Sequence, residues 1–203
     1  VVNTGAANDI DATTTIALTA TADNAVITID SAADVESTGG AHTYTADDIL
    51  ITGTITASGQ SVTLKSSTGS DAIILGVAAN GTADTLQFTN AELQSIAATT
   101  LTIGASGAGA ITISGDVTPG SGSGGNVATV ALITGSTITA TSAGIIETNL
   151  ALTAGGAVNF TDSATNVTLL AIDTSTGNIT FIEANGFSVS TVAGVTGVDT
   201  DSG

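Results

Sequence analysis

Residues 99–117, TTLTIGASGAGAITISGDV, decide how the rest of the chain is interpreted. They contain two short units in which apolar and polar residues alternate, at 101–103 and 111–113, and each unit is followed by a turn rich in glycine. Period-two alternation is typical of a half-buried β-strand, and small flexible residues between strands supply turns. The stretch therefore predicts short strands at a spacing of about ten residues, with residues 104–109 (GASGAG) as a turn between them.

Similar units recur along all 203 residues, separated by Gly, Asn, Asp and Ser. Strands are expected at residues 16–18, 26–29, 51–55, 62–64, 86–88, 101–103, 111–113, 130–132, 138, 150–152, 158–160, 167–169, 179–181 and 187–189. One segment, residues 90–98 (NAELQSIAA), fits either a helix capped by Asn90 or the flank of a strand. The chain is thus predicted to be all-β.

Regular short strands fit either a repeat β-solenoid or a β-sandwich such as a pilin-like subunit. Three features favour the solenoid, in the form of a parallel β-helix. The expected inward residues are small or β-branched with no large aromatic anchor, threonines at outward positions can form ladders, and the units resemble one another. Rungs of about 20 residues, stacked about 4.8 Å apart, would give about ten rungs and a rod on the order of 50 Å long.

The composition excludes several classes of function. The chain carries a net charge of −17 with Lys65 as its single Lys or Arg, and only 2% of its residues are aromatic. Nucleic-acid binding is not expected, because affinity for phosphates depends on cations. An enzyme is not expected either. A sugar-cleaving β-helix usually needs cations and stacking aromatics beside its paired carboxylates, and this chain has many carboxylates but one cation and five aromatic residues. With no cysteine there is no disulfide or thiolate site.

The domain organisation is predicted to be one elongated β-rich repeat domain over residues 1–203. No segment reads as a linker, and the longest apolar run, residues 72–79, is far shorter than the roughly 20 residues of a membrane-spanning helix. The chain begins at Val1 without a recognisable signal segment. It is therefore expected to be a fragment or a processed subunit of a larger surface protein, located outside the cell or on its surface.

Residues 99–198 resemble the degenerate repeats of filamentous haemagglutinin-type bacterial exoproteins and adhesins. The resemblance is carried by the runs LITGSTIT (132–139), LALTAGGAVNF (150–160), TSTGNITF (174–181) and VAGVTGV (192–198). It is a resemblance of style, because no single motif is specific. It implies a right-handed parallel β-helix that forms part of a long surface adhesin.

The first half departs from this pattern at residues 37–48 (STGGAHTYTADD), which are expected to form a loop that leaves the rungs. His42, Tyr44, Asp47 and Asp48 gather there. A single histidine without a second histidine or a cysteine is not a zinc constellation, so a structural role is expected for these residues. No catalytic, metal or cofactor-binding residue is assigned.

Calcium is the one ion for which a hypothesis is kept, since hard cations prefer several oxygen ligands. The acidic turn residues are Asp9, Asp11, Asp30, Asp34, Asp71, Asp84, Asp116, Asp162 and Asp173. Neither an EF-hand nor a glycine-aspartate nonapeptide repeat is present, and aspartate is common in turns without any ion. Four Asn-x-Ser/Thr sequons are candidate glycosylation sites, at Asn80, Asn159, Asn166 and Asn178.

The function expected from these observations is a non-enzymatic structural module of an extracellular bacterial surface fibre or adhesin stalk. The alternative is a self-polymerising filament or surface-lattice subunit. A third hypothesis is an adhesin module that binds carbohydrate or a host surface through the 37–48 segment. The partners expected are further copies of the chain or its own continuation.

Overall fold

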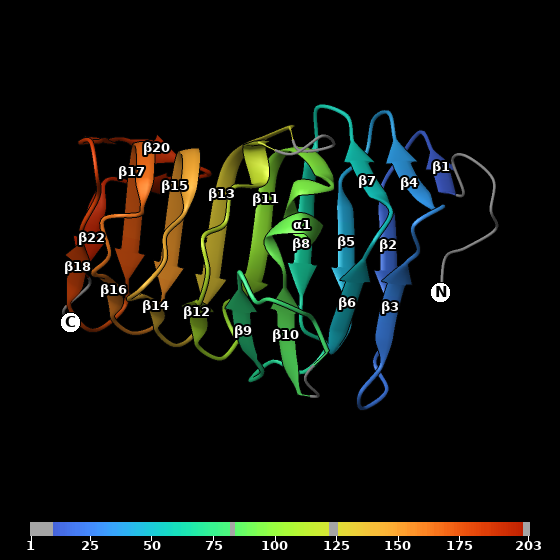
Figure 1. Ribbon diagram of the computed structural model, residues 1–203, viewed down its shortest axis with the longest axis horizontal. Helices are drawn as coiled ribbons and strands as arrows, with labels where there is room; N and C mark the ends of the chain where they lie inside the picture. The colour runs from blue at the N-terminus through green and yellow to red at the C-terminus, as the bar shows by residue number, and fades with distance from the viewer. Residues whose placement is uncertain (1–9, 82–83, 122–125, 201–203) are drawn as a thin grey trace.

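The structure is a computed structural model that describes residues 10–81, 84–121 and 126–200. This part of the chain is nearly all strand, with one short helix, α1 (Asn90–Gln94), and one 3-10 turn, η1 (Pro119–Ser121). The body is elongated, with β1 at one end and β18 and β22 at the other (Figure 1). The all-β prediction is confirmed.

One layer is a 12-stranded sheet, with short strands at both ends and longer strands between them. Its strands are β1 (Ile10–Ala12), β2 (Ile16–Thr19), β4 (Asp34–Ser37), β5 (His42–Thr45), β7 (Thr54–Ala57), β8 (Ser61–Lys65), β11 (Ile96–Ala105), β13 (Asn126–Thr134), β15 (Ile146–Ala154), β17 (Asn166–Thr174), β19 (Ser188–Val189) and β22 (Val198–Thr200). All the pairings in this sheet are parallel.

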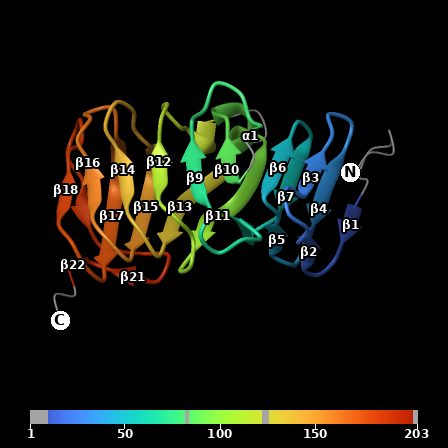
Figure 2. The ribbon, with the colours of Figure 1, turned by 90° about the horizontal axis from the view of Figure 1, so that it is seen from below.

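A second layer faces the first (Figure 2). It consists of a two-stranded sheet, β3 (Val26–Ile29) and β6 (Asp48–Ile51), and a six-stranded sheet whose order is β10 (Thr85–Phe88), β9 (Ala72–Leu75), β12 (Ile111–Ile113), β14 (Ile138–Ala140), β16 (Val158–Phe160) and β18 (Ile179–Phe181). These pairings are also parallel. Apart from β10, which follows β9 in the same layer and lies on its N-terminal side, the chain passes between the two layers and adds strands toward its C-terminal end.

The pairing register repeats every 20 residues over much of the body. Thr129 pairs with Asn149, and Asn149 pairs with Leu169. The same spacing joins Asp34 to Thr54. Residues paired in register on neighbouring parallel strands point to the same face of the sheet, so each step keeps inward residues inward. The 20-residue spacing predicted from the sequence is present in these pairs.

Two insertions lengthen the spacing in the middle of the chain. Ser61 pairs with Thr100, because β9, β10 and α1 lie between them, and Thr100 pairs with Thr129, because the segment with η1 intervenes. In the described residues, eight strands of the 12-stranded sheet follow one another in an unbroken hydrogen-bonded order from β1 to β19. These are consequently fewer than the ten rungs expected. At about 4.8 Å per step these strands span about 34 Å.

The core lies between the layers as a single cluster that runs from Ile16 to Ile172. It is built largely from Ile, Leu, Val and Ala, as predicted, but the expected absence of aromatic anchors is wrong. Tyr44, Phe88 and Phe160 are fully buried in it. The layers approach closely at Gly104, where an added Cβ would lie 3.2 Å from Ile73 Cδ1.

Local predictions need correction at four places. Residues 37–48 do not form a loop, because β5 lies within them and β6 begins at Asp48. The expected strand at 51–55 is interrupted after Ile51, and the turn expected at 104–109 starts later because β11 continues to Ala105. Residues 90–98, expected as a helix or as a strand flank, are divided between the two: α1 covers Asn90–Gln94, with Thr89 and not Asn90 as its cap, and β11 begins at Ile96.

A β-hairpin, β20 (Thr191–Val192) and β21 (Val195–Thr196), is the one antiparallel pair in the described chain. Ala193 and Gly194 both have positive φ, of 49° and 86°, as a two-residue type I′ turn requires. The hairpin packs on the outer face of the 12-stranded sheet, where Val192 covers a stripe formed by Ala131, Ala151 and Ala171. Threonines occupy the matching outward position on earlier strands, as at Thr63 and Thr102.

Candidate functional site

The two insertions, α1 and η1, contact each other on one side of the body. Asn90 Oδ1 accepts a hydrogen bond from the Thr118 N–H at 2.8 Å. Gln94 Nε2 donates to Thr118 Oγ1 at 2.6 Å. Side chains of α1 therefore fix the segment that leads into η1, and η1 in turn forms one wall of a cavity.

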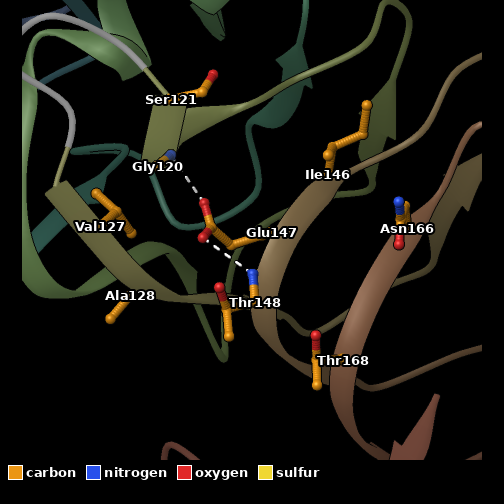
Figure 3. Close-up of a pocket in the computed structure, with 9 residues that line it drawn as sticks. All are labelled: Gly120, Ser121, Val127, Ala128, Ile146, Glu147, Thr148, Asn166 and Thr168. Carbon is orange, nitrogen blue, oxygen red and sulfur yellow. Dashed lines mark hydrogen bonds between the residues drawn. The ribbon is translucent and has the colours of Figure 1, made fainter.

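This cavity has a volume of about 480 Å³ and lies between η1 and the first residues of β13, β15 and β17 (Figure 3). It is lined by Gly120, Ser121, Val127, Ala128, Ile146, Glu147, Thr148, Asn166 and Thr168. Most of these residues are small or carry a hydroxyl or amide group. Glu147 is the one ionisable residue among them.

Glu147 occupies an inward position of β15. Its paired residue on the next strand, β17, is the apolar Val167. Its side chain is only 9% exposed. The carboxylate accepts hydrogen bonds from the Gly120 N–H at 2.8 Å and from the Thr148 N–H at 3.0 Å (Figure 3). A carboxylate among apolar residues is tolerated when such donors compensate for its lost hydration.

Burial raises the pKa of the Glu147 carboxyl above its ordinary value, and the hydrogen bonds from Thr148 and Gly120 partly oppose that rise. Gly120 is needed for this contact, since a Cβ there would lie 2.7 Å from Glu147 Oε1 and 2.9 Å from the Val127 carbonyl oxygen. The cavity thus offers one carboxylate with unused acceptor capacity, surrounded by hydroxyls. Its described lining contains no second carboxylate for an acid–base pair.

A second buried glutamate, Glu92, fixes the start of α1. Thr89 and Glu92 form a capping box, in which the Thr89 N–H donates to Glu92 Oε2 at 2.8 Å and the Glu92 N–H donates to Thr89 Oγ1 at 3.2 Å. The other oxygen, Oε1, accepts from the Ile51 N–H at 3.1 Å. Glu92 therefore joins the insertion to β6 in the second layer.

Asn80 and Asp48 lie beside Glu92. Asn80 Nδ2 donates to the Ile49 carbonyl at 3.1 Å and to Glu92 Oε1 at 3.2 Å. Burial raises the pKa of the Asp48 carboxyl, and the negative charge of Glu92 raises it further. Asp48 Oδ1 and Asn80 Oδ1 are buried without a hydrogen-bond partner in the described part of the chain.

His42 and Tyr44, placed in an expected surface loop, point into the core instead, and both are fully buried. His42 Nε2 lies 2.8 Å from Ser37 Oγ, and Nδ1 lies 3.1 Å from the Tyr44 hydroxyl. Ser37 Oγ donates to the Gly40 carbonyl, so it accepts from His42 Nε2–H, and Nδ1 accepts from Tyr44. Burial lowers the pKa of His42 and raises that of Tyr44.

Asp47, next to these residues, also has a structural role. Its side chain is buried and accepts a hydrogen bond from the Asn24 N–H at 2.8 Å and another from the Ser67 hydroxyl. It thereby joins turns on three successive passages of the chain.

The acidic turns proposed for calcium are dispersed along the body. Asp9 lies outside the described residues, Asp11 and Asp173 are in β1 and β17, and Asp84 has a positive φ of 57°. The others accept hydrogen bonds from nearby residues or from the next passage of the chain: Asp30 from Ser31, Asp34 from Thr54, Asp71 from Ser66, Asp116 from Gly144 and Asp162 from Ala164. No group of three acidic, histidine or cysteine side chains suited to a metal occurs in the described residues.

The four sequon asparagines differ in their surroundings. Asn166 and Asn178 are exposed, and Asn159 is half-buried on β16. Asn80 is half-buried and its amide nitrogen already donates the two hydrogen bonds described above. Glycosylation stays a prediction at all four positions.

Sequence reasoning missed the two buried glutamates. A signal existed for Glu92, because Thr89-x-x-Glu92 is a capping-box pattern. A weaker one existed for Glu147, which stands 20 residues before Val167 and so breaks an apolar position of the repeat.

Comparison with known proteins gives no relatives. No protein-family model, curated protein or solved structure matches the chain. Within the described residues, no helix is long and apolar enough to cross a membrane.

Proposed function

We propose that this chain is a β-solenoid, a right-handed parallel β-helix, that serves as a non-enzymatic rod-like module of an extracellular bacterial surface fibre or adhesin stalk. The observation that carries the proposal is the parallel pairing within both layers, which includes steps of 20 residues in each. Thr129, Asn149 and Leu169 follow one another in the first layer, and Ile138 pairs with Val158 in the second. A chain that passes repeatedly between two parallel layers and, apart from its insertions, advances along one axis is best explained as one continuous coil.

The right hand of the coil follows from general strand chemistry. Crossovers between parallel strands of one sheet are right-handed in almost all proteins, because twisted strands pack back onto the sheet only in that sense. The antiparallel sandwich is disfavoured because the pairings within both layers are parallel.

Stiffness is the property that this architecture supplies. Each passage contacts its neighbours through backbone hydrogen bonds, and the core is continuous from Ile16 to Ile172. The buried carboxylates of Asp47, Glu92 and Glu147 accept hydrogen bonds from turns and insertions, so they support the body where it departs from the repeat. A stalk needs this rigidity and no reactive centre.

The extracellular assignment is supported by composition. A net charge of −17 favours solubility, and one Lys with no Arg leaves a single site for trypsin-like proteases. The absence of cysteine and methionine removes the side chains most sensitive to oxidation. These features suit a surface exposed to proteases and oxidants.

The proposal is tested by adding one rung. Residues 146–165 would be duplicated after residue 165, with the copied Glu147 replaced by Val because Val167 occupies that inward position on the next strand. A solenoid should fold and lengthen by about 4.8 Å in small-angle X-ray scattering, with an unchanged cross-section. The control duplicates residues 146–155 only, a half-rung that breaks the register. Equal folding of both variants, or a cross-section that widens with the added rung, would contradict the solenoid.

A further inference from the structure

The tripeptide Ala-Asn-Gly occurs twice in the chain, at residues 79–81 and 184–186. In an Asn-Gly pair the backbone nitrogen of the glycine can attack the side-chain amide of the asparagine, because glycine has no Cβ to hinder the approach. The product is a five-membered succinimide ring, and the reaction is a deamidation because the amide nitrogen leaves as ammonia. Since the two tripeptides are identical, a large difference in their reactivity must come from the fold.

Asn80, in the first tripeptide, is held away from this reaction. It is half-buried, and its Nδ2 donates to the Ile49 carbonyl at 3.1 Å and to Glu92 Oε1 at 3.2 Å. Attack by the Gly81 nitrogen would require the amide group to turn and to leave both acceptors. Deamidation of Asn80 therefore depends on a local opening of the structure.

Asn185, in the second tripeptide, lies in the turn between β18 and β19 and has different surroundings. It is exposed, and its side-chain amide makes no hydrogen bond within the described residues. The N–H groups of Asn185 and Gly186 both donate to Glu183 Oε2, the former at 2.7 Å. The other oxygen, Glu183 Oε1, accepts from the Val167 N–H at 3.3 Å. A carboxylate is thus fixed against the nitrogen that attacks, while the amide that is attacked can turn toward it.

The exposure of Asn185 is that of an outer turn of the body. The corresponding turn of the preceding passage, residues 161–165, lies alongside, since the Ala184 N–H donates to the Thr165 carbonyl at 3.1 Å. Thr161 and Ser163 in that turn are exposed as well, although further passages of the chain lie on both sides of it. The reacting groups all belong to one turn, so the reaction requires no partner molecule other than water.

We propose that Asn185 deamidates in the folded chain, with the Glu183 carboxylate as the general base. As Glu183 Oε2 takes the proton from the Gly186 nitrogen, that nitrogen forms a bond to Asn185 Cγ. The proton then passes to Nδ2, the Cγ–Nδ2 bond breaks and ammonia leaves, which restores the carboxylate. Water next opens the succinimide ring and yields aspartate or isoaspartate at position 185. The inference concerns one turn and does not depend on the proposed stalk function.

The chemical nature of the acceptor makes this turn reactive. A backbone carbonyl in the same place would hold the Gly186 N–H without taking its proton, whereas a carboxylate within hydrogen-bond reach can accept it. The reaction replaces a neutral amide by a carboxylate two residues from Glu183, and isoaspartate also lengthens the main chain by one carbon. Because like charges so close repel each other, the product should hold this turn less firmly than asparagine does.

The test follows both asparagines in the wild-type chain during incubation near neutral pH. Peptides released by pepsin in acid, where deamidation is slow, are analysed by mass spectrometry for aspartate and isoaspartate. Asn185 should be modified roughly tenfold faster in the folded chain than in chain unfolded by urea, because only the fold places Glu183 against the Gly186 nitrogen. Asn80 should behave in the opposite way and react more slowly in the folded chain. Each site thus serves as the control for the other within one molecule.

Glu183→Gln keeps a hydrogen-bond acceptor but removes the base, so it should slow the reaction at Asn185 roughly tenfold and leave Asn80 unchanged. Asp199→Asn is the matched control, since it removes an exposed carboxylate from β22, outside this turn. Circular dichroism checks the fold of each variant, and the comparison of folded with unfolded wild type stands even if a variant does not fold. Equal rates at both sites in the folded chain, no acceleration over urea at Asn185, or a Glu183→Gln rate that is unchanged or higher would overturn the proposal.

Discussion

Glu147 and Gly120 form a contact that joins the repeat to the inserted segment that contains η1. The Gly120 N–H, in η1, donates to Glu147 Oε2 in β15 at 2.8 Å, across 27 positions of sequence. The carboxylate stands at an inward position of the repeat, and the glycine leaves the space it needs. The η1 segment is thus attached to the body through the buried Glu147 carboxylate, at a position where the next strand has the apolar Val167.

Gly120→Ala is expected to destabilise the chain by about 1 to 3 kcal/mol, because the new Cβ would displace either the Glu147 carboxylate or the Val127 carbonyl. Urea unfolding followed by circular dichroism measures the change. Gly69→Ala is the control, since its nearest contact would be a backbone oxygen at 3.9 Å. Equal stability of the two variants would show that η1 is not held through Gly120.

The buried carboxyl of Glu147 should also give a pH dependence of known sign. Its pKa is raised in the folded chain, so the native state binds a proton more readily than the unfolded state does. The contribution to stability is full below the ordinary value of 4.5 and is lost as pH rises through the folded pKa. Relative to Glu147→Gln, the wild type should therefore gain stability as pH falls from 7 toward 4.5.

This dependence is measured as the difference in unfolding free energy between the two proteins at several pH values. Asp23→Asn, which removes an exposed carboxylate of equal charge, provides the control. A difference that stays constant for Glu147→Gln, or that follows the Asp23→Asn difference, contradicts the assignment.

Much of the strand pattern could be predicted from the sequence, because apolar and polar residues alternate where one face is buried. The segments expected at residues 26–29, 111–113, 158–160 and 179–181 coincide with β3, β12, β16 and β18. Each carries two apolar residues two positions apart, flanked by turn residues. Local alternation was enough to find these strands and the 20-residue spacing between several of them.

The rest could not be predicted, because it depends on partners distant in sequence. The sequence predicts His42 and Tyr44 as polar loop residues, yet in β5 they point inward. There His42 forms hydrogen bonds with the hydroxyl groups of Tyr44 and Ser37. Glu147 looks like a surface acid until its donor, the Gly120 N–H, is known. An inward polar residue breaks the pattern by which strands are recognised, and only its hydrogen bonds explain its place.

The pKa of His42 can be measured directly, because it is the single histidine of the chain. Burial lowers this pKa, so the stabilising contribution is present above the ordinary value of 6.5 and is lost as pH falls through the folded pKa. An NMR titration of the imidazole should give a midpoint below 6.5, and an unfolded sample in urea should titrate near the ordinary value. A folded midpoint at or above 6.5 would show that the imidazole is hydrated or carries a charge partner.

If the chain is N-glycosylated, the four sequons should not be modified equally. Modification of Asn80 requires its Nδ2 to leave the Ile49 carbonyl and the Glu92 carboxylate, whereas Asn166 is exposed on the surface. Expression in a glycosylating host followed by peptide mass spectrometry should find sugar at Asn166 and little at Asn80. Glu92→Gln, which weakens the Asn80 contact, should raise occupancy at Asn80 and leave Asn166 unchanged. Full occupancy of Asn80 in the folded wild type would contradict this ranking.

The β20–β21 hairpin should act as a strap that stabilises the last strands of the sheet. Val192 is buried against Ala151 and Ala171. Two backbone hydrogen bonds hold the base of the hairpin: the Ser190 N–H donates to the Leu170 carbonyl at 3.1 Å, and the Ile172 N–H donates to the Gly197 carbonyl at 2.9 Å. Val192→Asp places a charge in this contact and should release the hairpin, at a cost of about 1 to 3 kcal/mol.

Hydrogen exchange should then quicken at Ser190 and Ile172 while β5 and β8 stay protected, because the body beneath does not depend on the strap. Thr191→Asp adds the same charge on the exposed side of the hairpin and should change little. If exchange quickens throughout the chain, the hairpin supports the whole body instead of its end.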